Sequence, residues 1–249
     1  MHFKDYFSAQ SVDYAKYRPR YPAEMFEYLA RLPQERERAW DCATGNGQAA
    51  LGLAPFFRQV IATDGSQAQL DQATPHERVS YQQATAESTS IEADSIDLVT
   101  VAQALHWLDL ERFYAEVRRV AKRGSILAVS CYNLLEIAPD VDEVVNRFYA
   151  ETVGPCWPPE RRFIEERYAT LAFPFEELEP PQFMMRERWN LLDLLGYFRT
   201  WSATQRFIKA RGFDPVPAVG EELLRLWPDA EEAREVTWPL YLRVGLVRI

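Results

Sequence analysis

Short apolar runs alternate with stretches of helical spacing between residues 38 and 132 of the 249-residue chain. The runs predict strands at residues 39–41, 59–63, 79–82, 96–101 and 125–130. The stretches between them predict helices at residues 47–56, 66–73 and 110–120. The last has Phe113, Val117 and Val120 on one helix face, whereas the link before residue 96 is expected to be a turn. Strands that alternate with helices favour a parallel sheet with right-handed crossovers.

The segments outside this core follow a different pattern. Residues 7–31 predict two helical pieces, because Pro19 and Pro22 interrupt them. Beyond residue 132 the pattern predicts, in chain order, a helix, a loop, a strand, a helix and a late antiparallel strand, at residues 140–149, 154–159, 183–189, 191–201 and 238–247. We therefore expect an α/β fold with a doubly wound, mostly parallel sheet that gains a late antiparallel strand.

Composition narrows the classes of function. The formal net charge of −9 argues against a nucleic-acid partner, because nucleic-acid-binding surfaces are normally basic. No apolar run approaches the roughly 18 residues of a membrane span, and the first residues lack the apolar core of a signal peptide. We therefore expect a cytoplasmic monomer or homodimer without a membrane partner. Cys42, Cys131 and Cys156 are too few for a disulfide framework or a metal knuckle, so reduced thiols and no bound metal are expected.

The first predicted strand leads into a loop with two glycines, at residues 41–47. In an open parallel sheet, ligands bind beyond the carboxyl ends of the strands. Gly45 and Gly47 permit positive φ angles and a close approach of the backbone to a ligand, and the following helix directs free amides at the site. The residues from Gly45 onward also fit the glycine motif of a dinucleotide-binding turn. Asp41, however, would repel a pyrophosphate and instead suits a cationic ammonium group.

Three further strand ends carry candidate binding groups. Asp64 ends the second strand, where a carboxylate accepts hydrogen bonds from ribose hydroxyls; the alternative is a turn or helix-capping role, because Asp-Gly is a common turn dipeptide. After the third strand, Ala86 and Glu87 suit the edge of an adenine, although Glu87 is equally compatible with a solvated side chain. The fourth strand leads into residues 102–107, which place His106 and Trp107 at the mouth of the crevice.

Together these motifs resemble those of the class I S-adenosylmethionine-dependent methyltransferases. They comprise Asp-x-Ala-x-Gly-x-Gly at residues 41–47, Asp64, the Ala-Glu pair at 86–87 and Gln-Ala-Leu-His-Trp at 103–107. Residues 14–22, 154–161 and 197–203 are similar to segments of the small-molecule branch that contains trans-aconitate methyltransferase. The resemblance covers nearly the whole chain and implies a Rossmann-like fold, S-adenosylmethionine as cofactor and S-adenosylhomocysteine as product.

The resemblance also implies a division of the chain and a role for each matching residue. One methyltransferase domain would span residues 1–249, with a helical lid at 1–37, the cofactor-binding core at 38–132, and a substrate-side helical insertion with the C-terminal strands at 133–249. Asp41 and the loop from Ala43 to Gly47 would hold the methionine part, although many relatives have glycine at position 43. Asp64 would bind the ribose, Ala86 and Glu87 the adenine, and Gln103 would lie beside the sulfonium. The remaining cofactor-binding candidates are Tyr14, Arg18, Gly65 and Ser66.

The acceptor side has fewer signals. His106 is a candidate general base, and its alternative is a group that only positions the acceptor. The other substrate-binding candidates are Trp107, Trp157, Arg199 and Trp201. The tryptophans form either an aromatic lid over the sulfonium or ordinary packing. Arg18 and Arg199 suit a carboxylate clamp, with a surface ion pair as the alternative for Arg199.

These candidates support one expected reaction and two alternatives. The expected reaction is O-methylation of a small carboxylic acid, because a carboxylate is already deprotonated at neutral pH and needs no base. A nucleotide-dependent oxidoreductase on the same sheet is the first alternative. A non-catalytic protein that only binds S-adenosylmethionine is the second.

Overall fold

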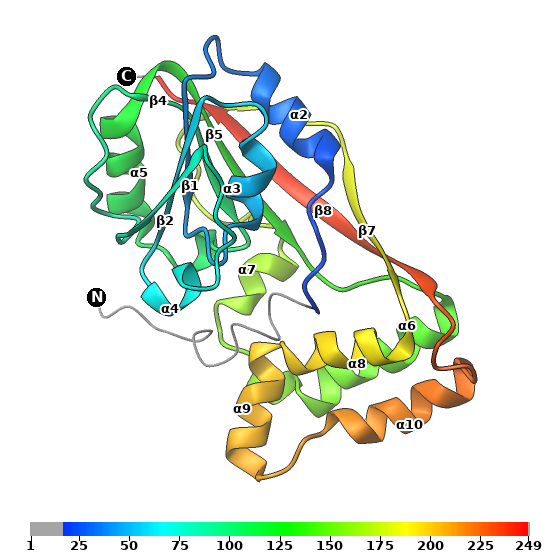
Figure 1. Ribbon diagram of the computed structural model, residues 1–249. Helices are drawn as coiled ribbons and strands as arrows, with labels where there is room; N and C mark the ends of the chain where they lie inside the picture. Colours follow the sequence, from blue (N-terminus) through cyan, green and yellow to red (C-terminus); the bar gives the residue numbers. More distant parts are fainter. Residues whose placement is uncertain (1–16, 249) are drawn as a thin grey trace.

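A mixed eight-stranded sheet forms the centre of the structure, a computed structural model that describes residues 17–248 (Figure 1). Five parallel strands make up its core: β1 (Arg38–Cys42), β2 (Gln59–Asp64), β3 (Val79–Gln83), β4 (Ile96–Ala102) and β5 (Ala121–Tyr132). All five were predicted from the apolar runs. β5 begins earlier than predicted, because Ala121 pairs with Ile96 ahead of a register shift in the β4–β5 ladder.

The remaining strands form an antiparallel edge. β8 (Arg234–Leu246) pairs antiparallel with β5, as predicted for the late strand. β7 (Phe183–Trp189) pairs with the first half of β8 and was predicted with the same bounds. β6 (Glu176–Leu178) pairs with the second half of β8 and was not predicted. β6 has three residues, none of them fully buried, and therefore no apolar pattern.

Helices cover both faces of the sheet. α2 (Ala23–Arg31) and α3 (Gln48–Leu53) belong to the apolar cluster on one face, and α5 (Leu110–Val120) belongs to the cluster on the other. α5 has its predicted bounds, and Phe113, Val117 and Val120 are fully buried. The short α4 (Gln67–Leu70) follows β2. Of the two helical pieces predicted at 7–31, the second corresponds to α2, and most of the first lies outside the described residues.

A helical layer follows β5 and lies at one end of the sheet, joined to it by the long β7–β8 ribbon (Figure 1). Its elements are α6 (Pro139–Arg147), the π-helical turn η3 (Phe148–Thr152), the 3-10 turn η4 (Gly154–Cys156), α7 (Arg161–Glu165), α8 (Leu191–Arg199), α9 (Ser202–Arg211) and α10 (Val216–Leu226). α6 and α8 correspond to predicted helices. The predicted loop at 154–159 begins with η4, and α7, α9 and α10 were not predicted.

The strand order defines where a ligand binds. The order is β3-β2-β1-β4-β5-β8-β6, so the chain runs outward from β1 to β3 and then crosses back to β4. The loops after β1 and β4 therefore diverge and leave a crevice at the carboxyl ends of the strands.

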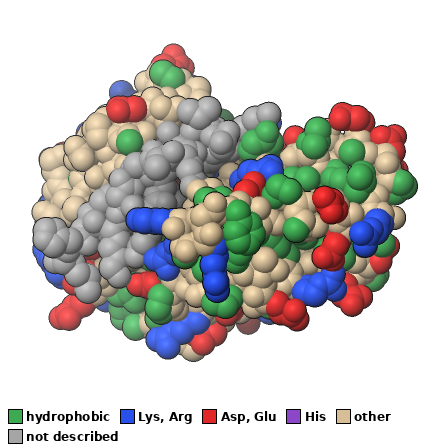
Figure 2. Space-filling model, turned by 90° about the horizontal axis from the view of Figure 1, so that it is seen from below, with side chains coloured by type: hydrophobic (Ala, Val, Ile, Leu, Met, Phe, Trp, Pro, Cys, Tyr) green, Lys and Arg blue, Asp and Glu red, His purple; other side chains and the backbone are tan. Residues whose placement is uncertain are grey.

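On the face seen from below in Figure 2, acidic and basic side chains are interspersed.

Candidate active site

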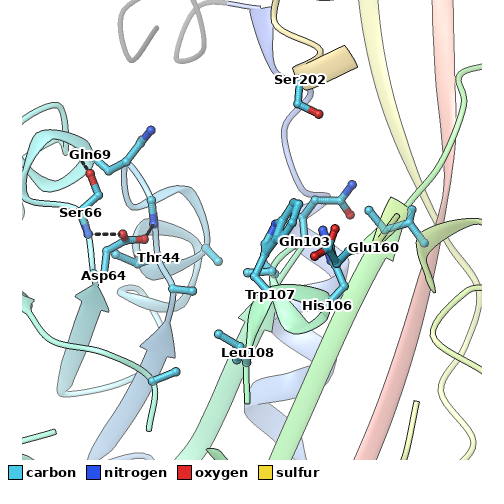
Figure 3. A pocket seen from close by; sticks show the side chains of 18 of the residues that line it. Thr44, Asp64, Ser66, Gln69, Gln103, His106, Trp107, Leu108, Glu160 and Ser202 are labelled. Atoms are coloured by element: carbon cyan, nitrogen blue, oxygen red, sulfur yellow. Dashed lines mark hydrogen bonds between the residues drawn. The ribbon is translucent and has the colours of Figure 1, made fainter. Parts of the chain in front are cut away.

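A cavity of about 520 Å³ lies at the carboxyl ends of the parallel strands, between the core and the helical layer. Most predicted site residues line it: Arg18, Asp41, Ala43, Gly45, Asp64, Gly65, Ser66, Ala86, Glu87, Gln103, His106, Trp107, Trp157 and Trp201. Gly47 and Arg199 do not line it, and Tyr14 lies outside the described residues. Figure 3 shows Asp64 and Ser66 on one side of the cavity and Gln103, His106 and Trp107 on the other.

The loop after β1 adopts left-handed backbone angles at three alternate residues. The φ angles are 55° at Ala43, 57° at Gly45 and 88° at Gly47. The angle at Ala43 is one that favours glycine, because a side chain at positive φ is unfavourable. A Cβ on Gly47 would lie 2.4 Å from the Tyr81 hydroxyl oxygen. Gly47 therefore packs against Tyr81 on the side of the loop away from the cavity, and its contact with the cofactor remains a prediction.

Asp41 lies beneath this loop and is only 1% exposed. Its Oδ1 accepts a hydrogen bond of 2.8 Å from Thr100, the residue paired with it on β4, and its Oδ2 accepts one of 2.5 Å from Thr44. Burial raises the pKa of Asp41 to about 6, although both threonine hydrogen bonds oppose the shift. The carboxylate thus orders the loop as well as lining the cavity, and its contact with an ammonium group remains a prediction.

Asp64 joins the loops after β1 and β2. Its Oδ2 accepts a hydrogen bond of 2.8 Å from the Gly45 backbone N–H, and its Oδ1 accepts one of 2.8 Å from the Ser66 N–H (Figure 3). The turn role considered for Asp64 is therefore present. The ribose role remains a prediction that the position at the cavity wall supports.

Glu87 and Gln103 are both held by backbone groups. The Glu87 Oε1 accepts a hydrogen bond of 3.1 Å from the Asp109 N–H, at the start of α5. The Gln103 side chain forms two hydrogen bonds with the Tyr132 backbone, donating to its carbonyl at 3.0 Å and accepting from its N–H at 2.9 Å. Gln103 also has a positive φ of 57°. Its amide thus ties the end of β4 to the end of β5 at the cavity lining.

His106 lies on the 3-10 turn η2 (Leu105–Trp107) and is largely buried. Its Nδ1 is 2.8 Å from the hydroxyl oxygen of Tyr168, which the sequence reasoning did not single out. Burial, assisted by the charge of Arg161, lowers the pKa of His106 to about 3. Such an imidazole is neutral at physiological pH and a weak proton acceptor, which favours the positioning role over that of a general base.

The aromatic candidates pack together at the far wall of the cavity. The ring centroids of Trp157 and Trp201 are 5.7 Å apart, and those of Tyr149 and Trp157 are 4.9 Å apart. Trp201 is only 4% exposed. The packing alternative therefore holds for Trp201, and both tryptophans supply a rigid wall.

Arg161 was missed by the sequence reasoning, although it ends a segment that resembles the methyltransferase branch. It lines the cavity and is stacked 4.6 Å above the Trp157 ring. Its Nε donates to the Tyr149 hydroxyl at 2.8 Å, and its Nη2 donates to the Asn133 Oδ1 at 2.6 Å. Its Nη1 has no hydrogen-bond partner among residues 17–248 and is not sealed from the cavity.

The other two arginines considered for a carboxylate clamp lie in different places. Arg18 lines the cavity and donates at 3.2 Å both to the Tyr132 hydroxyl and to the Thr200 carbonyl. Arg199 is outside the cavity, where it pairs with Asp214 at 2.8 Å and is 45% exposed. The substrate-binding prediction for Arg199 is therefore wrong, and the surface ion pair is correct.

Comparisons with known proteins agree with this geometry. Residues 40–129 match a family model described as a methyltransferase domain. A Dictyostelium discoideum protein named as a methyltransferase is 32% identical, over 96% of this chain and 94% of its own. A solved structure described as a type II methyltransferase from Anaeromyxobacter dehalogenans is 44% identical and superposes with a TM-score of 0.87, over 93% of this chain and 98% of that one. A Saccharomyces cerevisiae protein named as an S-adenosylmethionine-dependent methyltransferase is 28% identical, over 56% of this chain and 51% of its own.

The fold and the lining of the cavity define an enzyme that transfers a methyl group. The chain belongs to the class I S-adenosylmethionine-dependent methyltransferases. The cavity fits this cofactor, because carboxylates lie where a cationic amino acid and a ribose would bind. The oxidoreductase alternative is thereby set aside. No helix within residues 17–248 has the length and apolar character to cross a bilayer.

Proposed function

We propose that this enzyme methylates a carboxylate oxygen of a small acceptor. The observation that carries the proposal is the guanidinium of Arg161 at the acceptor side of the cavity. Three neighbours hold it in place, and its Nη1 still has hydrogen-bonding capacity. Guanidinium groups bind carboxylates with strong, directional hydrogen bonds, and Arg18 adds a second positive charge to the lining of the same cavity.

The protonation state of His106 supports the same class of acceptor. An alcohol or an ammonium group must lose a proton before it accepts a methyl group, and an imidazole with a pKa of about 3 is a poor base for that task. A carboxylic acid has lost its proton at neutral pH. When bound, S-adenosylmethionine supplies an electrophilic methyl group, which bonds to the carboxylate oxygen as the carbon–sulfur bond breaks, leaving S-adenosylhomocysteine and a methyl ester.

The protein then contributes position rather than proton transfer. Arg161 is fixed by Tyr149, Asn133 and Trp157, and the aromatic wall around it excludes water from one side of the acceptor. Holding two reactants in line in this way lowers a barrier by up to about 7–11 kcal/mol. This is sufficient for a reaction whose electrophile is already activated.

The test is a methyl-transfer assay with purified protein and methyl-labelled cofactor. The acceptor panel pairs each small carboxylic acid with the amine, alcohol and amide of the same carbon skeleton. We expect label only in the acids, in a product that releases methanol in mild alkali, as esters do. Transfer confined to amines, alcohols or nucleic acid would refute the proposal.

A further inference from the structure

Tyr168 contacts His106 and does not itself line the cavity. It follows α7, and its side chain is only 1% exposed. Its hydroxyl oxygen is 2.8 Å from the His106 Nδ1, with the ring centroids 5.8 Å apart. Because the side chain is sealed from solvent, its hydroxyl proton must be directed at a protein acceptor.

The Tyr168 hydroxyl proton can be placed in one way that gives the hydroxyl an acceptor and the His106 Nδ1 a donor. Burial raises the pKa of Tyr168 well above its usual value, so the phenol keeps its proton. Within residues 17–248 the one hydrogen-bond partner of the Tyr168 hydroxyl is the His106 Nδ1. The buried hydroxyl therefore donates its proton to that nitrogen. An Nδ1 that accepts leaves the imidazole proton on Nε2.

The Nε2 atom of His106 faces the cavity. It has no hydrogen-bond partner among residues 17–248 and is not fully buried. It is therefore accessible from the cavity that His106 lines. Arg161 begins α7, which packs against η2, the turn that carries His106, and both side chains line the cavity. An N–H at Nε2 would thus be a second donor beside the Nη1 of Arg161.

We infer that Tyr168 is a positioning residue that fixes His106 as the Nε2–H tautomer, so that His106 donates a hydrogen bond to the acceptor's carboxylate. The identity of the acceptor rests on the proposed function, whereas the tautomer does not. Two fixed donors, one charged and one neutral, would hold the two oxygens of a carboxylate and reject an ammonium group, which has no acceptor atom.

The backbone around Tyr168 supports a role for this placement. Arg167 and Tyr168 both adopt left-handed angles, with φ of 56° and 59°, which are unfavourable for side chains of their size. Arg243 on β8 holds this turn by donating to the carbonyls of Tyr168 at 2.7 Å and Leu171 at 3.0 Å. Glu177 in turn fixes Arg243 at 2.6 Å. The antiparallel edge of the sheet thus keeps the Tyr168 hydroxyl against His106.

The tautomer is measured directly by NMR on the full chain labelled with ¹⁵N-histidine. The sequence has three histidines, and the signal that His106→Gln removes identifies His106. At pH 7 and without an acceptor we expect the proton on Nε2 in the wild type and a mixture of tautomers in Tyr168→Phe. A proton on Nδ1 in the wild type, or a tautomer unchanged by Tyr168→Phe, would overturn the inference even if the acceptor proves to be a carboxylate.

Kinetics separates this role from a merely structural one. The amide nitrogen of glutamine reaches the position of Nε2, whereas that of asparagine reaches the position of Nδ1. We expect His106→Gln to keep kcat/KM for the acceptor within about 3-fold and His106→Asn to lower it about 10- to 100-fold, because a donor to a charged group is lost. The cofactor Kd should be unchanged in both. Equal losses in the two variants would refute a donor at Nε2.

A matched tyrosine controls for the loss of a buried hydroxyl. Tyr114 is 3% exposed and donates at 2.7 Å to the Ala172 carbonyl, in the same apolar cluster as Tyr168 but away from the cavity. We expect Tyr168→Phe to raise the acceptor KM about 3- to 10-fold and Tyr114→Phe to leave it unchanged, at comparable Tm. An equal effect of the two variants on KM would contradict the inference. If methyl groups are transferred only to other acceptor classes, the proposed function fails while the NMR result still decides the tautomer.

Discussion

The two sides of the cavity are built in opposite ways. The cofactor side comes from residues 41–87, at the ends of three neighbouring strands, and its charged lining includes the carboxylates of Asp41, Asp64 and Glu87. The acceptor side joins parts of the chain that are far apart in sequence, and there Arg18 and Arg161 contribute positive charge while Glu160 contributes one carboxylate. The sign of the dominant charge therefore changes across one cavity, which suits a cationic cofactor opposite an anionic acceptor.

The substitution with the largest expected effect on this contrast is Asp64→Ala. The variant removes the carboxylate that binds the Gly45 and Ser66 amides and, by our prediction, the ribose. Hydrogen bonds to a charged group contribute about 1.5–3 kcal/mol each, so we expect the cofactor Kd to rise about 100-fold or more. Calorimetry with S-adenosylhomocysteine measures it. Asp71→Ala, an exposed carboxylate at the end of α4 outside the cavity, is the control; an unchanged Kd in Asp64→Ala would contradict the assignment.

The acceptor side is tested by Arg161→Met. Methionine keeps an apolar chain against Trp157 but removes the guanidinium, so we expect the acceptor KM to rise about 10- to 100-fold through loss of a charge-assisted hydrogen bond. The cofactor Kd should change little. Arg199→Met is the matched control, since that guanidinium pairs with Asp214 outside the cavity. If both variants shift KM equally, Arg161 has no specific role in binding the acceptor.

The loop after β1 is tested by Gly47→Ala, for which the chain offers a second glycine as control. A Cβ at residue 47 meets both a φ of 88° and the Tyr81 ring, whereas a Cβ at Gly124 meets a φ of 82° and no atom within 4 Å. Backbone strain of this kind costs about 1–3 kcal/mol. We expect both variants to lower the free energy of unfolding, Gly47→Ala by more, with only Gly47→Ala weakening cofactor binding. Equal decreases in the free energy of unfolding of the two variants would show that the Tyr81 ring moves aside without an energetic cost.

The cofactor side could be predicted from the sequence because it depends on local motifs. Each strand end carries its own binding residues, and the parallel order of the sheet brings those ends together. Asp41, Gly45, Asp64 and Glu87 were placed correctly at the cavity for this reason. The packing of Gly47 against Tyr81 on β3 could not be predicted, because it is not visible in the spacing of the loop itself.

The acceptor side could not be predicted in the same way. Arg161 reaches the cavity because α7 packs beside η2 and residues 148–157 form an aromatic wall, and neither arrangement follows from a local pattern. Arg199 was assigned to the cavity because it lies near Tyr197 and Trp201 in the sequence. On a helix, however, residues two positions apart differ by about 200° in direction, so Arg199 points away from the side on which Tyr197 lines the cavity.

The smallest expected effect is the pH dependence of cofactor binding through Asp41. Its pKa in the free protein is raised to about 6 by burial, so the carboxyl is largely protonated at pH 5 and charged at pH 7. A bound ammonium group would favour the charged form and lower this pKa. The cofactor Kd should therefore rise as pH falls through 6. The expected rise from pH 7 to pH 5 is about tenfold, because one ionising group changes Kd by at most tenfold for each unit of pH below its pKa. Calorimetry in buffers of different ionisation enthalpy should detect proton release on binding at pH 5 but not at pH 7, and Asp41→Asn should abolish it; a Kd independent of pH in the wild type would show that Asp41 only orders its loop.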